Sequence, residues 1–370
     1  MINPFINYPF IPESVALLTN YTKAANQLGM RVKFYYTVRE LSNHCAEIWA
    51  LRQLGTEIYD RPSCGDSMAT SCGGGAWLQE QLVGAYQPAW FDQLQKPNGA
   101  DAAIAQSGTA GRWLNYYIEG LRESIERPPF INGIYYDGIL FDRFTMVRVR
   151  KTLERYSTDL EPLIDMHTGN DFTYAEHRVT DAVAYANHWA YVDSLWIGEG
   201  FSYDSPPHQW LLEISGMPFG IFSDMLGAPN KYRGMLFGST GRFGCSNPTP
   251  MWEFWDAFGI QDSDMVGWWE PELPVTVFEN LGIVASTDVL ATCYVVKGKK
   301  TLLAIASWAP TNVSATFAFD WAALGLDAGA VSNVTAPAIE GFQAARSWRI
   351  SDGISVAPGK GWLLVIESGS

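Results

Sequence analysis

The stretch Asn132-Gly-Ile-Tyr-Tyr-Asp-Gly-Ile-Leu-Phe-Asp-Arg143 decides the fold. It predicts a short buried strand at 133–136 that carries a carboxylate, Asp137, at its C-terminal end. A glycine and an apolar triplet follow, and Asp142 is then a suitable N-cap for a helix at 143–156. In a protein built of strands followed by helices, a carboxylate at this point faces the functional site. The predicted helix has an apolar side formed by Phe144, Val147, Val149 and Leu153, with Arg148, Arg150 and Lys151 facing outward.

Strands and helices alternate on both sides of this stretch. Further strands are predicted at 31–38, 162–167, 194–198 and 218–223, and further helices at 12–28, 42–54, 113–126, 176–189 and 208–214. Such alternation over about 250 residues is typical of a parallel sheet with helical crossovers, and at this length of a (β/α)8 TIM-type barrel. A doubly wound sheet is disfavoured because no glycine-rich phosphate turn follows the first strand. Apolar segments at 235–239 and 265–269 are predicted to close the barrel.

The pattern changes at residue 274 to short strands without long helices. These strands are predicted at 289–296, 301–307, 314–319, 344–350 and 362–367. We therefore expect two domains, a (β/α)8 barrel at 1–273 and a C-terminal all-β sandwich at 274–370.

The composition limits the classes of partner. The chain of 370 residues has a net charge of −14 and no basic run, which argues against nucleic acid or an anionic membrane surface as a partner. Aromatic residues make up 14% of the chain, with 15 Trp, and such side chains stack on the apolar faces of sugar rings. The alternative, that most of these Trp fill the core, stays open.

The five cysteines, Cys45, Cys64, Cys72, Cys245 and Cys293, show no metal-ligand spacing. We expect neither a metal nor a cofactor, and the odd cysteine count leaves at least one free thiol. The chain contains no secretory signal or membrane-length apolar run. Either the protein is intracellular or a leader lies outside this chain, as in a secreted or periplasmic protein, so its location is left open, as is its oligomeric state.

Active sites of such barrels lie at the C-terminal ends of the strands, so candidates are polar residues that end an apolar run. These are Arg39, Glu40, Asp137, His167 with Asn170, and Glu199. None is a serine or cysteine with a local nucleophile signature, which makes hydrolysis by paired carboxylates the leading chemistry.

Asp137 and Glu199 form the best pair because each follows a run that is expected to be buried on both faces. One carboxyl would protonate the leaving oxygen while the other attacks, orients a participating group or activates water. Trp196, Trp77 and Glu80 join the sugar-binding candidates, and the glycine-rich segment 60–111 is predicted as a wall of the cleft.

Structural roles compete with each of these assignments. Asp137 could pair with Arg39 or Arg143 as part of the scaffold, and His167 could be a core histidine with satisfied hydrogen bonds. Asp165 shares a side of its strand with His167 and is expected to hold an arginine. A metal site made of Asp137, Asp165 and His167 lacks ligand spacing.

Several separated blocks together carry a family resemblance. They are Asn7-Tyr-Pro-Phe10, Phe34-Tyr-Tyr-Thr-Val-Arg-Glu-Leu-Ser-Asn-His44, Trp77-Leu-Gln-Glu80, Ile134-Tyr-Tyr-Asp137 with Phe141-Asp-Arg143, Leu195-Trp-Ile-Gly-Glu199, Ile214-Ser-Gly-Met-Pro-Phe-Gly220 and Pro337-Ala-Ile-Glu-Gly-Phe342. Over nearly the whole chain they resemble bacterial-type proteins related to glycoside hydrolase family 123.

The resemblance implies a (β/α)8 glycosidase barrel followed by a β-sandwich. It also implies a retaining β-N-acetylgalactosaminidase mechanism, in which an adjacent Asp-Glu pair ends the fourth barrel strand. The Asp orients the substrate acetamido group, which is the nucleophile, and the Glu is the acid/base. Here Asp137 matches the Asp, but Gly138 stands in place of the Glu. Glu199 or another strand-end acid would have to replace it.

A second departure is at the N-terminus, since longer relatives carry a further strand before the segment that matches 3–10. The chain is then a truncated form, a separate short form or a barrel closed in an unusual way. Two rival functions also stay open. One is a non-catalytic carbohydrate-binding protein on a glycosidase barrel, which the missing acid favours, and the other is a metal-dependent hydrolase.

Overall fold

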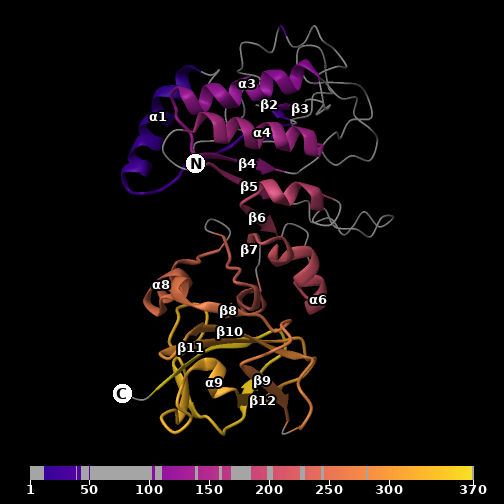
Figure 1. Ribbon diagram of the computed structural model, residues 1–370, viewed down its shortest axis with the longest axis vertical. Helices are drawn as coiled ribbons and strands as arrows, with labels where there is room; N and C mark the ends of the chain where they lie inside the picture. The colour runs from indigo at the N-terminus through magenta and orange to yellow at the C-terminus, as the bar shows by residue number, and fades with distance from the viewer. Residues whose placement is uncertain are drawn as a thin grey trace, which may run out of the picture. The chain divides into compact units, whose positions relative to one another are not determined.

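The computed structural model describes residues 12–38, 40–42, 50, 102–104, 111–137, 141–157, 161–167, 185–197, 203–225, 230–242, 246–280 and 282–368. The chain divides into two compact units. The first contains Met1–Gly169 and Ala184–Leu195, and the second contains Asn170–Val183 and Trp196–Ser370. Figure 1 labels the elements of each unit.

The first unit consists of parallel strands and helices. Its elements are α1 (Pro12–Gln27), β1 (Lys33–Tyr35), β2 (Glu40–Ser42), β3 (Ala102–Ile104), α3 (Arg112–Glu126), β4 (Gly133–Asp137), α4 (Arg143–Tyr156), β5 (Leu163–His167), the 3-10 helix η3 (Ala186–Tyr191) and the start of β6 (Ser194–Ile197). Strands β1, β4, β5 and β6 lie in this order in one sheet. The first three are parallel, with Phe34 beside Ile134 and Ile134 beside Ile164. The predicted alternation of strand and helix is confirmed here.

The two faces of this sheet differ in chemistry. One face is apolar and includes Ile134 and Tyr136, both completely buried. Helices α3 and α4 lie over the sheet on one side (Figure 1). The ring of Tyr117 in α3 stacks on Tyr36 at 4.5 Å, and Trp113 of the same helix donates from its indole nitrogen to the Val38 carbonyl at 2.7 Å. The apolar face is therefore the side that packs against helices, and the alternate residues form the opposite face.

Gly133 sets how closely β4 and β5 approach each other. A Cβ atom at this position would lie 2.2 Å from the Leu163 carbonyl oxygen and 3.0 Å from the Leu163 carbonyl carbon. The obstacle is backbone, which cannot rotate away as the end of a side chain can. Glycine is therefore required at the start of the strand for this pairing.

Helix α4 begins as predicted, but its outward side differs from the prediction. The Asp142 carboxylate accepts from the Thr145 backbone nitrogen at 2.9 Å, which confirms the N-cap. Phe144, expected on the apolar side, is 54% exposed. Arg150, expected to face outward, is mostly buried because its guanidinium donates to the Pro162 carbonyl at 2.9 Å and to Asp193 at 2.8 Å.

The second unit begins with short elements. They are the rest of β6, α6 (Pro207–Gln209), the π-helix η4 (Trp210–Ile214), the 3-10 helix η5 (Met217–Phe219), β7 (Phe222–Met225), α7 (Lys231–Gly234), the 3-10 helix η6 (Met235–Phe237), α8 (Thr249–Phe258) and the 3-10 helix η7 (Ile260–Asp262). The strand predicted at 218–223 starts later because Gly216 and Gly220, both with a φ of +71°, enclose η5. The strand predicted at 235–239 is wrong, since residues 235–237 are helical.

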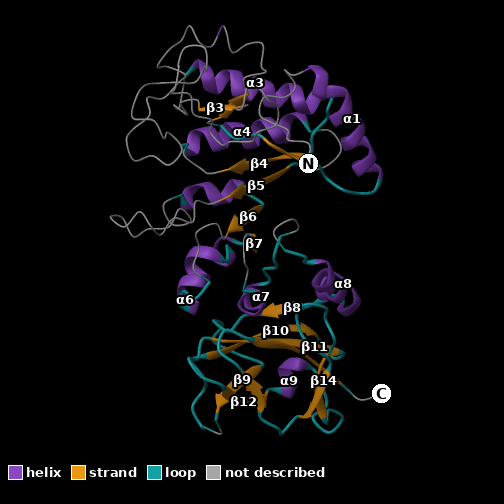
Figure 2. Cartoon of the chain, turned by 180° about the vertical axis from the view of Figure 1, so that it is seen from behind, coloured by secondary structure: helices purple, strands orange, loops and turns teal. Residues whose placement is uncertain are grey.

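The rest of the second unit is mainly antiparallel β-structure (Figure 2). Its elements are β8 (Asp264–Val266), β9 (Val275–Glu279), β10 (Val289–Val296), β11 (Lys300–Ser307), β12 (Val313–Phe319), α9 (Trp321–Leu324), β13 (Asn333–Ala336), β14 (Arg346–Arg349), β15 (Ile354–Val356) and β16 (Gly361–Glu367). One sheet has the order β14-β13-β16-β11-β10-β8 and the other β15-β12-β9.

The inner faces of these two sheets share one apolar core. It includes Val277 of β9, Ala315 of β12, Leu303 and Ile305 of β11 and Ile366 of β16. All five strands predicted in this region are present, and two sheets that enclose one core form a sandwich. Strand β8, predicted within 265–269 to close the barrel, instead pairs antiparallel with β10. The domain boundary at 273/274 stays a prediction.

Cys293 is a free, buried thiol on β10. Burial raises the pKa of this thiol to about 12, so it is not a reactive cysteine. The other four cysteines lie outside the described residues. Within the described parts of the chain, no helix has the length and apolar character to cross a membrane.

We predict that Gly133→Ala lowers the free energy of unfolding by ~1–3 kcal/mol, because the new methyl group would push β4 away from β5. The free energy of unfolding in urea measures this effect. Gly329→Ala is the control, since a Cβ there meets nothing closer than Asp327 Oδ1 at 3.5 Å. Equal stability of the two variants would show that the close approach at Gly133 is not required.

Candidate functional site

Two of the predicted site residues end adjacent parallel strands. Asp137 is the last residue of β4 and His167 the last residue of β5, and the two are register partners. Neighbouring strands lie ~4.8 Å apart, so these positions are direct neighbours at the C-terminal edge of the sheet. The sequence predicted both strand ends correctly. His167 is 7% exposed.

A charged cluster lies on the same face of the sheet, deeper than His167. The Asp165 carboxylate, 2% exposed, forms an ion pair with Lys33 of β1 and accepts a hydrogen bond from the Ser194 hydroxyl of β6. The residue on β4 beside Lys33 is Gly133, so the ion pair spans β4 from β1 to β5. Asp165 therefore holds a lysine and not the predicted arginine.

An aromatic pair separates Lys33 from the strand ends. Tyr35 of β1 and Tyr135 of β4 are register partners whose ring centroids lie 5.5 Å apart. Tyr135 is in turn the partner of Asp165, so this row comes one step before Asp137 and His167. Along this face, the register partners are first Lys33 and Gly133, then Tyr35, Tyr135 and Asp165, and last Asp137 and His167 at the C-terminal edge.

A buried histidine, His188, contacts the segment that leads into α4. His188 of η3 has its Nε2 atom 2.9 Å from the Phe141 carbonyl oxygen and its Nδ1 atom 2.7 Å from Asn187 Oδ1. The Phe141 ring lies between Tyr136 at 4.9 Å and His188 at 5.6 Å. Burial lowers the pKa of His188, and the Phe141 carbonyl opposes part of this shift.

Trp196, in the second unit, is half-buried on β6, with the Arg242 guanidinium over its ring. Arg242 directly follows residues that pair with β7, since its backbone nitrogen donates to the Met225 carbonyl at 3.0 Å. The guanidinium therefore covers one face of the indole ring. Sequence analysis missed Arg242 because no apolar run precedes it.

The remaining predicted residues are placed differently or fall outside the described residues. Glu40 does not end β1, which stops at Tyr35; it begins β2, where its backbone pairs with Ile104 of β3. This small antiparallel pair also replaces the start of the helix predicted at 42–54. Arg39, Trp77, Glu80, Asn170 and Glu199 lie outside the described residues.

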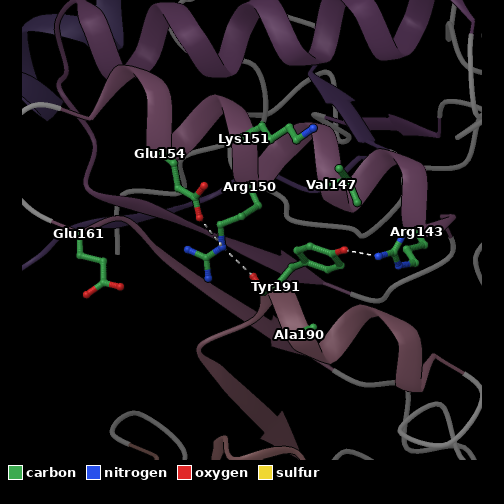
Figure 3. A pocket seen from close by; sticks show the side chains of 8 residues that line it. All are labelled: Arg143, Val147, Arg150, Lys151, Glu154, Glu161, Ala190 and Tyr191. Atoms are coloured by element: carbon green, nitrogen blue, oxygen red, sulfur yellow. Dashed lines mark hydrogen bonds and ion pairs between the residues drawn. The ribbon is translucent and has the colours of Figure 1, made fainter.

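A groove of about 550 Å³ on the first unit is not part of these strand ends (Figure 3). It lies between α4 and η3 and includes Arg143, Arg150 and Tyr191. Arg143 donates to the Tyr191 hydroxyl, and Arg150 donates to the Tyr191 carbonyl at 3.1 Å. These hydrogen bonds join α4 to η3. The two guanidinium groups of the groove are therefore already engaged by protein groups.

Among the residues that the structure describes, no group of three or more His, Cys, Asp and Glu side chains is arranged to hold a metal ion. Asp165 is instead occupied by Lys33 and Ser194.

Comparison with protein families decides the kind of enzyme. The model described as "Glycoside hydrolase 123, TIM-barrel domain" matches residues 1–244, and "Glycoside hydrolase 123, C-terminal domain" matches residues 247–367. The chain belongs to glycoside hydrolase family 123. It is therefore an O-glycosyl hydrolase by family, with a carbohydrate as its substrate class. No curated protein matches the chain in sequence.

Solved structures agree with the fold of this family 123 protein. An α-amylase from Anoxybacillus is 9% identical, with a TM-score of 0.51 over 96% of this chain and 80% of the amylase. A β-L-arabinopyranosidase from Geobacillus stearothermophilus is 9% identical over 97% and 80% of the two chains, with a TM-score of 0.48. The first likeness shows the fold alone, and the second carries no inference. The predicted TIM-type barrel followed by a C-terminal β-domain is confirmed.

We predict that His188 makes the family 123 protein less stable in acid. Its folded pKa lies below the unfolded value of ~6.5, so the unfolded chain binds the proton more readily. The stabilisation is complete above the unfolded pKa and is lost as the pH falls through the folded pKa. Urea unfolding of the wild type and His188→Gln, between about pH 8 and pH 5, measures the difference.

The His188→Gln variant should lose part of this pH dependence, whereas His208→Gln, which changes an exposed residue of α6, should keep it. Identical pH profiles for the wild type and His188→Gln would contradict the assignment of the shift to His188.

Proposed function

We propose that this family 123 protein hydrolyses a glycosidic bond in a polysaccharide or glycoconjugate, with Asp137 and Glu199 as its catalytic carboxylates. The observation that carries the proposal is the position of Asp137, which ends β4 beside His167. In TIM-type barrels, catalytic residues come from the ends of several strands. β6 ends at Ile197, two residues before Glu199, so the second acid also follows a strand.

The role of Asp137 follows from the chemistry of the substrate. If the sugar carries an acetamido group, the Asp137 carboxylate orients that group for attack on the anomeric carbon, as the family resemblance implies. If the sugar lacks one, the carboxylate itself attacks or activates water. In both cases a charged carboxylate stabilises positive charge that develops on the sugar ring.

Glu199 is proposed as the general acid that protonates the leaving oxygen. The need for it arises because Gly138 directly follows Asp137, where the family pattern has the acid. A glycine side chain cannot donate a proton. We propose that the acid comes from β6 instead of β4, and that Arg39, Glu40, Trp77, Glu80, His167, Asn170 and Trp196 contact the sugar.

The same glycine favours a second function, carbohydrate binding without hydrolysis. A protein that keeps the groove but lacks the acid would bind glycans and turn none over. Aryl glycosides distinguish the two, because a good leaving group needs little acid catalysis. Turnover of any aryl glycoside supports the enzyme, and binding of glycans with no turnover supports the alternative.

We predict that Asp137→Asn and Glu199→Gln each lower kcat by about 10²–10⁴-fold on a natural leaving group while the protein stays folded. The measurement is hydrolysis of a panel of methyl N-acetylhexosaminides and hexosides, whose poor leaving group needs the acid, with the anomer of the product followed by NMR; the matching 4-nitrophenyl glycosides serve for the rescue experiment. Small anions or acids such as azide and formate should rescue Glu199→Gln but not Asp137→Asn.

The control is Glu161→Gln, which changes an exposed carboxylate of the first unit. Unchanged turnover by Asp137→Asn on a competent substrate would remove Asp137 from the mechanism. Unchanged turnover by Glu199→Gln would show that Glu199 is not the acid that replaces the one missing at Gly138, and that another residue has this role.

A further inference from the structure

A pocket of about 350 Å³ lies in the second unit, and none of its lining residues is assigned above to catalysis. Its lining comes from α7 with η6, from residues 239–241 and 246–251, and from the turn Ile339-Glu-Gly-Phe342. We call it the α7 pocket. Its volume falls in the range of small-molecule sites. The turn belongs to a block of sequence that carried the family resemblance and has no role in the proposed mechanism.

The turn that forms one wall is fixed from both sides. Ile339 and Gln343 pair through their backbones at 2.9 and 3.0 Å, and the Tyr232 hydroxyl of α7 donates to the Phe342 carbonyl at 2.9 Å. The Gln343 amide donates to the Leu363 carbonyl of β16 at 2.9 Å and accepts from the Leu363 nitrogen at 2.9 Å. The pocket is therefore largely preformed, which reduces the entropy lost when a ligand binds.

The floor of the pocket is apolar. It comprises Met235, Met251, Ile339 and Phe342, each less than 9% exposed. The ring of Phe342 lies 4.6 Å from that of Tyr232. Flexible thioethers beside an aromatic ring suit the C–H face of a compact ligand.

Positive charge gathers at this aromatic pair. Lys231 Nζ lies 5.7 Å from the centre of the Phe342 ring, and Lys360 Nζ lies 5.3 Å from the centre of the Tyr232 ring. No carboxylate of a described residue lies within ion-pair distance of either lysine, although the chain has 39 acidic residues against 25 basic ones. Burial, and then the charge of Lys360, lowers the pKa of Lys231.

These lysines favour an anionic group in the α7 pocket, because an anion would offset both the desolvation of Lys231 and its repulsion by Lys360. A bare inorganic anion does not fit the other lining residues. Glu340, an exposed residue of the turn, also lines the pocket and would repel an anion, whereas its carboxylate accepts hydrogen bonds from hydroxyl groups. The Asn247 side chain adds an amide donor.

We propose that the α7 pocket is a second carbohydrate site, which binds a sugar unit that carries an acidic substituent, either a carboxylate or a sulfate ester. Lys231 binds the acidic group, Glu340 accepts from ring hydroxyls, and Phe342 and the two methionines contact the apolar face of the ring. Such a site would hold an acidic glycan chain on the enzyme. It does not require Asp137 or Glu199 to be catalytic.

The test is binding of four probes to the whole protein by isothermal titration calorimetry and saturation-transfer NMR. The probes are galacturonic acid, galactose 6-sulfate, galactose and inorganic sulfate. We expect one or both acidic sugars to bind, and galactose and inorganic sulfate to bind about tenfold or more weakly, because each lacks one part of the recognition. Which acidic sugar binds decides between carboxylate and sulfate.

Two variants of lining residues and one control variant test whether the ligand binds in the α7 pocket. Lys231→Met should weaken the acidic sugar about tenfold to a hundredfold, the effect of losing a charge-assisted hydrogen bond, while the matched change of an exposed lysine, Lys299→Met, should have no effect. Glu340→Gln should tighten binding of inorganic sulfate because the repulsion is removed.

Equal binding of galactose and the acidic sugars, binding that Lys231→Met leaves unchanged, or no binding of either acidic sugar would overturn the proposal. Inorganic sulfate that binds as tightly as galactose 6-sulfate would also overturn it, since the sugar would then contribute nothing. Because the readout is binding, a failure here is distinct from a failure of the proposed hydrolysis, which the aryl glycosides report.

Discussion

The Lys33–Asp165 ion pair is the contact on which the arrangement of the first unit depends. It joins β1 to β5 across β4, where Gly133 is the register partner of Lys33. A carboxylate as buried as Asp165 is costly unless it is paired, so the pair disfavours any slip of these strands. A slip of one residue would exchange the faces to which the side chains of a strand point. The same contact therefore keeps Asp137 beside His167 at the edge of the sheet.

The sequence predicted most of the elements but fewer of the contacts. The strands ending at Asp137 and His167 and the cap at Asp142 follow from local patterns, and the structure has them where they were expected. Short-range signals of this kind depend on neighbours in the chain. The position of Arg150 does not, because its burial depends on Pro162 and Asp193, which lie on other elements.

Residues that act across the sheet were harder to find. Lys33 is an ordinary lysine within an apolar run, and only the register of three strands shows that it faces Asp165. The pairing of β8 with β10 was likewise hidden, since an apolar segment fits a barrel strand and a sandwich strand equally well. Of the proposed site, the sequence placed Asp137 and His167 at strand ends, whereas Glu199 and four further residues stay predictions.

Family 123 membership gives these features a common chemistry. Asp137 and His167 end their strands, one step beyond the Tyr35–Tyr135 pair and the Asp165 carboxylate, which Lys33 neutralises. The carboxylate proposed for catalysis is therefore at the C-terminal edge of the sheet. Gly138 stands where the family resemblance places the acid, and Glu199, which follows β6 in the sequence, is the residue proposed in its place.

The most direct test of the central claim is a double-mutant cycle on Lys33→Met and Asp165→Asn, followed by urea unfolding. The account predicts that the two changes are not additive, with a coupling free energy on the order of 1–3 kcal/mol, because each removes the same contact. Lys33→Met should be the more destabilising single change, since it leaves a buried carboxylate without its cation. Additive effects would show that the two side chains are not paired in the folded protein, and would contradict the account.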